Sequence, residues 1–596
     1  MNLRRGMLGA TIALGVATVS APIIAEAQGF GRGGGPRYTP EADERDLKSV
    51  LFNWPWYMGM LRGIEEHELI VSLEYRAEGT IQVDGQDCAI APFEDAAREG
   101  ELGTSGFRIS ANYQEPGYRT QISCTLPNGD TYSSIEVVGE GEYAWNEDIP
   151  GAGLVPGQGT ATPTPDALEE RLIRLWASPY GAPKAALAGA GIPLRRVWRD
   201  PGGLLEAGSS TIGATSVTWD GETPVITFPI PGVDGAEATA RLDDRFMTES
   251  VVVTHGSDTY EFTYGNYDDY NNPLHLIEVY MAGTMTESKN GEVMRELRTR
   301  QTETGSVYVV VPVPASVGPA TLAVEMYGTD QEAPVLDSTA PTPRLADGTP
   351  DLTGNWRGNN KFFIWAYGNR RCAPTQLEGC SPQWNQTVDF TFEAASRFGP
   401  NRPLYLPEHW DEVIYLDMWT NRYDPIMTCQ PMGIPRQGAP GRIFHTEEDI
   451  TLLYGSGGDG GGGYPDFRVI ATDGSEVSER QVVQTKYTGH SVGHWEGDTL
   501  VIESIGFTPA TWLARGGFFH SEEMKVTERF TRRGDQMLYE VTVEDPQVLL
   551  APWTLNPLLL TTGGGGGGFG GGGLVGTERG HCQELELDDI VSQYRH

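Results

Sequence analysis

Alternation of apolar and polar positions predicts strands over most of the chain. Between residues 67 and 83 (HELIVSLEYRAEGTIQV) the alternation is partial. Between residues 121 and 138 (QISCTLPNGDTYSSIEVV) two strand patterns flank Asn128-Gly129, a dipeptide typical of hairpin turns. Further runs of this kind fill residues 216–313. The pattern predicts a long, twisted antiparallel sheet in the first half of the chain.

Two stretches depart from the strand pattern and predict helices. The first runs from about Glu41 to Arg62, where Pro55 predicts a kink or an early end because proline removes a backbone donor. The second starts at Thr164-Pro165-Asp166, which offers an N-cap, a proline at the first position and an acid in the first turn. Its apolar stripe is typical of core packing and consists of Leu168, Leu172, Leu175 and Trp176.

The second half is also rich in strand patterns, interrupted by two glycine runs. Neither run has the spacing of a phosphate-binding loop, and we interpret both as surface loops. The fold class expected is mainly β: an N-terminal curved antiparallel half-barrel with a few helices, then a C-terminal antiparallel β-sandwich or barrel-like domain. The expected segments are a signal peptide (1–27), a disordered glycine-rich segment (28–40), the half-barrel (41–327), a linker (328–348) and the C-terminal domain (349–596), with glycine-rich loops at 455–463 and 563–573.

The first residues have the pattern of a cleavable export signal. Arg4 and Arg5 precede a mostly apolar stretch over residues 7–25, and Ala25-Glu26-Ala27 has the small-x-small form of a cleavage site. A buried N-terminal helix is the alternative interpretation. The pattern favours a periplasmic or extracellular protein that is cleaved near Ala27.

Composition narrows the set of partners. The chain of 596 residues carries 43 basic and 81 acidic side chains, a formal net charge of −38. Such a surface repels nucleic acid and anionic lipid headgroups. After the signal no segment is long and apolar enough to span a bilayer, so an integral membrane protein is not expected.

Export makes disulfides possible, and the number of cysteines is even. None is arranged as C-x-x-C, which argues against a zinc knuckle. We expect each pair to lie within one domain; proximity in sequence suggests the first two pairs, and the third takes what remains. The expected pairs are Cys88–Cys124, Cys372–Cys380 and Cys429–Cys582.

Residues 40–315 resemble the curved half-barrel of periplasmic lipoprotein carriers and sensors of the LolA/RseB type. The resemblance is architectural: an export signal, one long meander and helices on its concave side. It implies an apolar ligand in that concavity and assigns no residues.

The C-terminal half resembles a family of uncharacterised secreted bacterial proteins. Four motifs occur in the family's order: PDLTGNW (350–356), a Cys-Gln-Pro-x-Gly-x-Pro-Arg segment (429–436), GHWEGDTLVIES (493–504) and HSEEMKVTERF (520–530). The long glycine runs depart from the family pattern. The resemblance brings no reaction with it.

The stretch GHSVGHWEGDTLVIES (489–504) predicts a hairpin, although it holds two histidines four residues apart. Its glycines disfavour a helix, Leu500-Val501-Ile502 favours a strand, and Gly497-Asp498 fits a two-residue type II′ turn. Alternation then places Trp495, Leu500 and Ile502 on the core side. The other side carries His490, His494, Glu496 and Glu503.

That second side is either a solvated surface or a functional site. His520 follows a Gly-Gly break that could bring it close, and Glu528 and Arg529 lie on the next strand. One interpretation is a divalent metal ion held by His490, His494, His520 and Glu503. Another is metal-free catalysis by His494, oriented by Glu503 and assisted by His520.

An aromatic cluster in the first helix is the remaining candidate. Trp54, Trp56 and Tyr57 predict core packing or, alternatively, the lining of a groove for an apolar ligand. The favoured function is an exported protein that binds an apolar or amphipathic small molecule, such as a lipid-like ligand. The alternative is an extracytoplasmic hydrolase or lyase with a His/carboxylate site, and the glycine runs alone suggest a structural protein.

Overall fold

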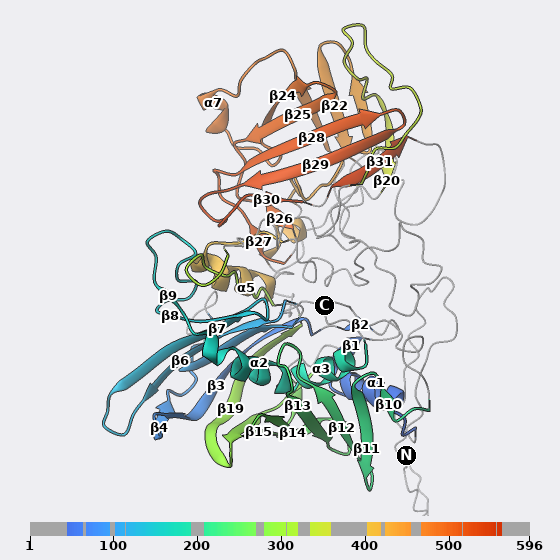
Figure 1. Cartoon of the computed structure of the whole chain (residues 1–596). Coiled ribbons are helices and arrows are strands. Elements are labelled where there is room, and N and C mark those ends of the chain that lie inside the picture. Colours follow the sequence, from blue (N-terminus) through green and yellow to red (C-terminus); the bar gives the residue numbers. More distant parts are fainter. Residues whose placement is uncertain are drawn as a thin grey trace, which may run out of the picture. The chain divides into compact units, whose positions relative to one another are not determined.

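The computed structural model shows a mainly β protein with large antiparallel sheets, as the sequence predicts (Figure 1). It describes residues 44–62, 67–68, 70–95, 102–113, 115–191, 208–269, 279–305, 307–319, 334–358, 402–418, 423–428, 430–454, 466–514, 516–555 and 557–562.

Among the described residues, no helix combines the length and the apolar character needed to cross a membrane.

The first sheet has fifteen strands and runs as a long meander. Its order is β10-β11-β12-β13-β14-β15-β18-β19-β3-β4-β6-β7-β8-β9, and β5 pairs with β3 and β6 beside this path. The pairings within this sheet are antiparallel, and β1–β2 and β16–β17 form separate small sheets. The strands are β1 (Leu61–Arg62), β2 (His67–Glu68), β3 (Ser72–Val83), β4 (Gln86–Ile90), β5 (Phe107–Asn112), β6 (Gly117–Thr125), β7 (Thr131–Gly139), β8 (Tyr143–Glu147), β9 (Ala161–Pro163), β10 (Thr211–Ile212), β11 (Thr215–Asp220), β12 (Thr223–Pro229), β13 (Glu237–Leu242), β14 (Thr248–His255), β15 (Asp258–Gly265), β16 (Asp268–Asp269), β17 (Tyr280–Met281), β18 (Thr284–Lys289) and β19 (Glu292–Gly305).

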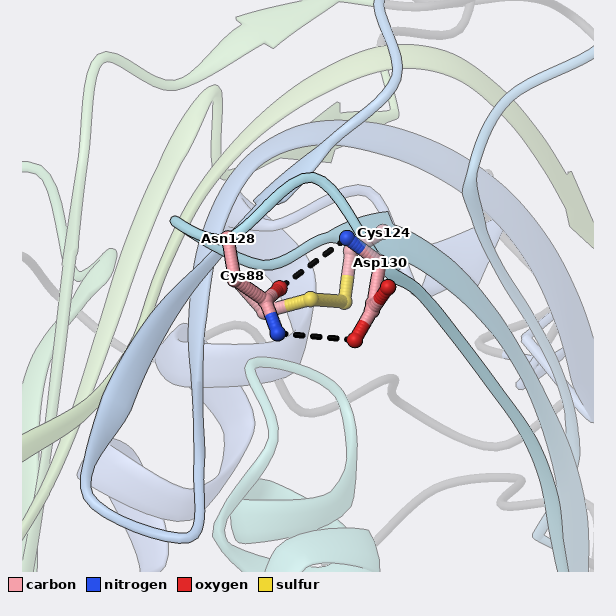
Figure 2. Close-up of a disulfide and its surroundings, with 4 residues drawn as sticks. All are labelled: Cys88, Cys124, Asn128 and Asp130. Atoms are coloured by element: carbon pink, nitrogen blue, oxygen red, sulfur yellow. Dashed lines mark hydrogen bonds between the residues drawn. A yellow bond between two sulfur atoms is a disulfide. The ribbon is translucent and has the colours of Figure 1, made fainter.

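The hairpin and the first disulfide predicted in this sheet are both present (Figure 2). Gly129 takes a φ of 88° in the β6–β7 turn, a backbone conformation that favours glycine. Asn128 and Asp130 exchange two hydrogen bonds across the turn, of 2.7 and 3.0 Å. The Cys88–Cys124 disulfide links β4 to β6, where those two strands pair. The other four cysteines lie outside the described residues.

Three of the described helices pack on this sheet: α1 (Leu47–Tyr57), α2 (Leu168–Ala177) and α3 (Gly181–Gly189). α1 ends two residues after Pro55, in agreement with the predicted early end. Thr164 makes no side-chain cap; Pro165–Ala167 form a 3₁₀ turn that leads into α2. Three residues of the predicted stripe of α2 are buried: Leu172, Leu175 and Trp176.

The second large sheet closes into a nine-stranded barrel, which decides between the two predicted architectures for the C-terminal half. Closure comes from β28, which pairs with both β25 and β29. Inward positions alternate along the strands and place an apolar core in the interior, as in other small barrels. The ring runs β28-β25-β24-β23-β22-β21-β20-β31-β29, with β30 beside β29. Among the described strands of the ring, β23 and β24 pair in parallel and the others pair antiparallel.

The described chain contains further strands and α-helices. The strands are β20 (Gly354–Gly358), β21 (Arg442–His445), β22 (Asp449–Tyr454), β23 (Asp466–Ala471), β24 (His490–Glu496), β25 (Thr499–Ile505), β26 (Trp512–Ala514), β27 (Phe518–Phe519), β28 (Lys525–Arg533), β29 (Gln536–Glu544), β30 (Trp553–Thr554) and β31 (Leu558–Thr562). The helices are α5 (Trp410–Met418) and α7 (Glu479–Val482). Both glycine runs lie outside the described residues, apart from their flanks.

Candidate ligand-binding cavity

The predicted histidine hairpin is present, with the expected register. β24 and β25 pair His494 with Val501 and Trp495 with Leu500, and Gly497 takes a φ of 62° in the two-residue turn between them. Leu500 and Ile502 are buried in the barrel, and Trp495 packs against the same core. The histidine-bearing side of the ribbon is therefore the outer side of the barrel.

The histidines on this outer side do not share a site. His490 is buried, and its Nε2 donates to the Gln484 carbonyl oxygen over 2.7 Å. The His494 side chain is 51% exposed and lies 3.4 Å from Glu496. The Glu503 carboxylate pairs with Lys525 instead of orienting His494, because the neighbouring strand brings that ammonium group beside it.

The other predicted site residues also interact with side chains or backbone groups outside the predicted site. His520 is buried; its Nδ1 lies 2.8 Å from the Ser521 carbonyl and its Nε2 lies 2.6 Å from the Thr511 hydroxyl. Glu528 points into the barrel, where it pairs with Arg468 at 2.6 Å. Arg529 pairs with Glu496 on the outer face at 2.7 Å.

The side chains that the sequence suggested as one metal or catalytic site thus each contact other partners. Within the described ranges, no group of three or more His, Cys, Asp or Glu side chains is arranged to hold a metal ion. A joint role for His490, His494, His520 and Glu503 lacks the convergence on one point that metal binding requires.

The aromatic residues of α1 line neither the cavity nor the groove described below. Trp54 is buried and donates from Nε1 to the Thr248 hydroxyl over 2.9 Å. Trp56 stacks on Phe52, while Tyr57 is partly exposed and stacks on Phe246. Trp54 therefore has the core role, and the other two rings lie near the surface.

A cavity of about 70 Å³ lies instead against the first sheet, beneath the end of α2. Residues two apart on a strand point to the same face, and inward positions of several strands contribute its walls. The walls are apolar or aromatic apart from a few hydroxyl and charged groups. The lining residues are Leu73, Tyr75, Phe107, Ile109, Ala111, Tyr113, Tyr118, Thr120, Arg174, Leu175, Ser178, Pro179, Phe262, Tyr264, Met281, Met285, Thr286, Glu287, Arg295 and Leu297.

Charged side chains form a chain of ion pairs beside this cavity. Arg174 on α2 donates from Nε to Glu287 over 2.7 Å, and Arg295 contacts the same carboxylate at 3.6 Å. Arg295 also reaches Glu136 at 3.3 Å, and Arg174 pairs with Glu170. Burial alone would lower the pKa of Arg174, but these carboxylates, Glu287 first, raise it above its usual value. Arg174 is therefore a permanent cation at the cavity wall.

Two hydroxyl groups in the cavity wall lack hydrogen-bond partners in the described part of the chain. Tyr118 and Thr120 are both buried on β6 and both line the cavity, since they lie two residues apart. Burial raises the pKa of Tyr118 to about 12, so its hydroxyl keeps its proton at neutral pH. By contrast, the Tyr113 hydroxyl contacts Ser178 at 3.0 Å and the Tyr264 hydroxyl donates to the Ala177 carbonyl over 2.7 Å. These two hydroxyls are therefore buried without a partner in the described chain, and each exposes less than 1 Å².

An open groove of about 560 Å³ adjoins the cavity. The two share Met285, Thr286 and Leu297 as lining residues. Gly79 forms part of the groove, where a Cβ atom would lie 1.9 Å from the Glu296 carbonyl oxygen. Glycine is therefore required where β3 and β19 approach each other. The groove is further lined by Glu78, Ile90, Pro92, Thr284, Glu296 and Arg298.

The cavity residues were not identified from the sequence. Alternation in GYRTQISCT and DTYEFTYG could have shown that Tyr118, Thr120 and Tyr264 share faces with apolar neighbours. Nothing in the sequence shows that these strands, more than a hundred residues apart, enclose one space.

Comparison with known proteins gives little support for a family. No protein-family model matches the chain and no curated protein matches it, so the family resemblance of the C-terminal half rests on its four motifs. Among solved structures, a LolA superfamily protein from Nitrosomonas europaea matches with 10% identity, over 44% of this chain and 94% of that chain. Its TM-score of 0.20 is too low to carry an argument about fold or function.

Proposed function

We propose that the chain binds an apolar or amphipathic small molecule along the groove and cavity of its first sheet. The observation that carries the proposal is that a cavity and an open groove adjoin on the first sheet, with Met285, Thr286 and Leu297 lining both. Ligand sites are typically concave, mostly apolar and furnished with a few polar groups.

Volume limits how such a ligand could lie. The enclosed end, at about 70 Å³, has room for a few water molecules or a small chemical group. The groove, at about 560 Å³, falls within the range of small-molecule sites, roughly 300–1,000 Å³. The ligand would therefore occupy the groove with most of its length and place one end in the cavity.

Binding of a neutral apolar dye to the full chain tests this proposal. N-phenyl-1-naphthylamine should gain fluorescence on binding, and Leu297→Trp should weaken its affinity about tenfold or more by filling the boundary between groove and cavity. Val293→Trp is the matched control, because Val293 lies on the same strand, is exposed and lines neither space. Equal binding by both variants, or no binding to the unaltered chain, would contradict the proposal.

We also propose that the protein is exported and loses its first 27 residues. The Cys88–Cys124 disulfide supports this, since such bonds persist mainly in oxidising compartments. Mass measurement of the protein recovered from its native host should give a chain that begins at Gln28. An intact first residue would contradict export by this signal.

A further inference from the structure

One part of the outer surface of the barrel is apolar although it is exposed. Phe444, Val469 and Phe467 have exposed fractions of 40%, 53% and 64%. They belong to the outward positions of β21, β22 and β23, which stand opposite one another in two rows, Phe444–Thr451–Val469 and Arg442–Leu453–Phe467. We refer to these six residues as the apolar face, since four of them are hydrophobic.

Other strands of the same barrel have a polar outer surface. β24, β25 and β28 turn outward the half-exposed ring of His494 and two ion pairs, Glu496–Arg529 and Glu503–Lys525. Antiparallel sheets commonly keep one side polar and solvated in this way. A contiguous exposed apolar patch instead marks a contact surface. The apolar face therefore has the character of a surface that another segment covers.

The size of the apolar face limits what can cover it. Strands lie about 4.8 Å apart and rise about 3.3 Å per residue, so three strands of four to six residues present roughly 250 Å². A stable interface between two proteins takes about 800 Å² from each partner. The face alone is too small for that, but it suits a short segment of the same chain, because tethering supplies a high effective concentration.

The chain leaves the barrel close to this face at the end of β31. Thr562, the last residue of β31, pairs with Trp356, and the adjacent Asn355 pairs with Arg442 of the apolar face. Two strand spacings thus separate Thr562 from Arg442, roughly 10 Å. Residues 563–582 follow, and an extended chain spans up to about 3.3–3.6 Å per residue. Residues beyond 582 can therefore reach every part of the apolar face.

The last residues of the chain have a sequence pattern that suits an apolar sheet surface. Residues 583–596 (QELELDDIVSQYRH) lie outside the described residues. Leu585 and Leu587 alternate with Glu584 and Glu586. In an extended segment both leucines point to one side and both carboxylates to the other. Such a segment presents an apolar side to the barrel and a charged side to water.

We propose that residues 583–596 dock on the apolar face in an extended conformation, with Leu585 and Leu587 against the exposed side chains of Phe467 and Val469. The segment shields these side chains from water and from contacts with other chains. The proposal concerns the barrel and is independent of ligand binding in the first sheet.

Binding of the isolated segment to a shortened chain tests this docking. A chain that ends at Cys582 keeps all six cysteines and every described residue, so it should fold. A fluorescently labelled peptide of residues 583–596 should bind this chain and should bind the full chain at least about tenfold more weakly, because the tethered segment already occupies the face. Fluorescence anisotropy measures both affinities. No binding to the shortened chain, or equal affinity for the two chains, would overturn the proposal.

Substitutions on both partners assign the binding to the apolar face. In the shortened chain, Phe467→Glu should weaken peptide binding about tenfold or more, since it places a charge on the face. Val483→Glu is the matched control: Val483 is 83% exposed and lies at the end of α7, outside the apolar face. A peptide with Leu585→Ser and Leu587→Ser keeps every charge and should lose binding. Equal binding by Phe467→Glu and Val483→Glu, or by the two peptides, would overturn the proposal.

Sedimentation of the full chain distinguishes this segment from a second copy as the occupant. We expect Phe467→Glu to leave the sedimentation coefficient of the full chain unchanged, because the face is covered from within the same chain. A dimer of the full chain that Phe467→Glu dissociates would show that a second copy covers the face, and would overturn the proposal.

Discussion

Met285 and Leu297 lie directly opposite each other on β18 and β19, and both line the enclosed cavity as well as the open groove. These two residues, together with Thr286, therefore border both spaces. Neither residue is polar, so a chain that passes this point meets only apolar atoms from the pair. This boundary is the place where a substitution can alter access to the cavity without touching its polar groups.

Met285→Ala should widen that boundary at a cost in stability. Met285 is buried, and truncating a buried methionine typically lowers the free energy of unfolding by about 2–5 kcal/mol. We expect the lower end, because the side chain borders an open groove. Urea unfolding measures the cost, and stopped-flow mixing with the dye should show faster entry. A slower or unchanged rate would contradict the role of this boundary in access.

Glu287→Gln should destabilise the protein because it removes the carboxylate that joins Arg174 to Arg295. The change leaves two largely buried guanidinium groups facing each other, and breaking a buried pair costs about 3 kcal/mol. Glu292→Gln, exposed at the start of β19, is the matched control and should cost little. The midpoint of urea unfolding is the measurement; similar midpoints for the two variants would argue against a structural role for this chain of ion pairs.

Gly79→Ala should be severely destabilising. Gly79 has a φ of 143°, and a Cβ atom there would lie 1.9 Å from the Glu296 carbonyl oxygen, so β3 and β19 would have to separate. We expect a loss of about 3 kcal/mol or more in the free energy of unfolding. Gly85→Ala is the control: its φ of 75° is strained for alanine, but no atom lies within 4 Å, so about 1 kcal/mol is expected.

The sequence predicted local features of the fold better than the candidate site. The Asn128-Gly129 turn, the β24–β25 register and the Cys88–Cys124 bond each depend on residues close in sequence, where turn chemistry and alternation are decisive. The cavity depends on distant strands: Tyr118 and Met285 meet the same space only after the sheet curves. Alternation identifies a face but does not show which face is concave.

For the predicted histidine site, too, the sequence predicted the face of the strands but not the interaction partners of the side chains. Alternation correctly placed His494 and Glu496 on the face away from the core. Which partner each side chain takes depended on the neighbouring strand, since Lys525 and Arg529 of β28 pair with Glu503 and Glu496. A cluster on one strand pair is therefore weak evidence for a site until the adjacent strand is known.

Replacing both Cys88 and Cys124 with serine should lower the free energy of unfolding. The bond closes a loop with a sequence separation of 36 residues, for which the chain-entropy estimate is about 4 kcal/mol. Calorimetry of the double variant in oxidising buffer should show a lower melting temperature. Reduction of the unaltered protein should reproduce the shift if the other cysteines contribute little. An unchanged melting temperature in the double variant would show that the strand pairing of β4 with β6 suffices on its own.

His520→Gln should remove part of the loss of stability at mildly acidic pH. Burial lowers the pKa of His520 below its usual value, and the Ser521 carbonyl and Asp545 only partly oppose this. The unfolded chain therefore binds a proton more readily than the native protein once the pH falls below about 6.5. The stability linked to this ring is fully present above that pH and is lost as the pH falls toward the depressed native pKa. Urea unfolding of the variant at a series of pH values from 7.5 to 5 should accordingly give a shallower decline.

The hydrogen bonds around the His520 ring are consistent with the lowered pKa. The Ser521 carbonyl can only accept, so Nδ1 carries the proton of the neutral ring and Nε2 accepts from Thr511. A second proton on Nε2 would remove that acceptor inside a buried site. His494→Gln is the matched control, since its ring is half exposed. A decline that is equally steep in His520→Gln and in the unaltered protein would show that other groups govern the acid sensitivity.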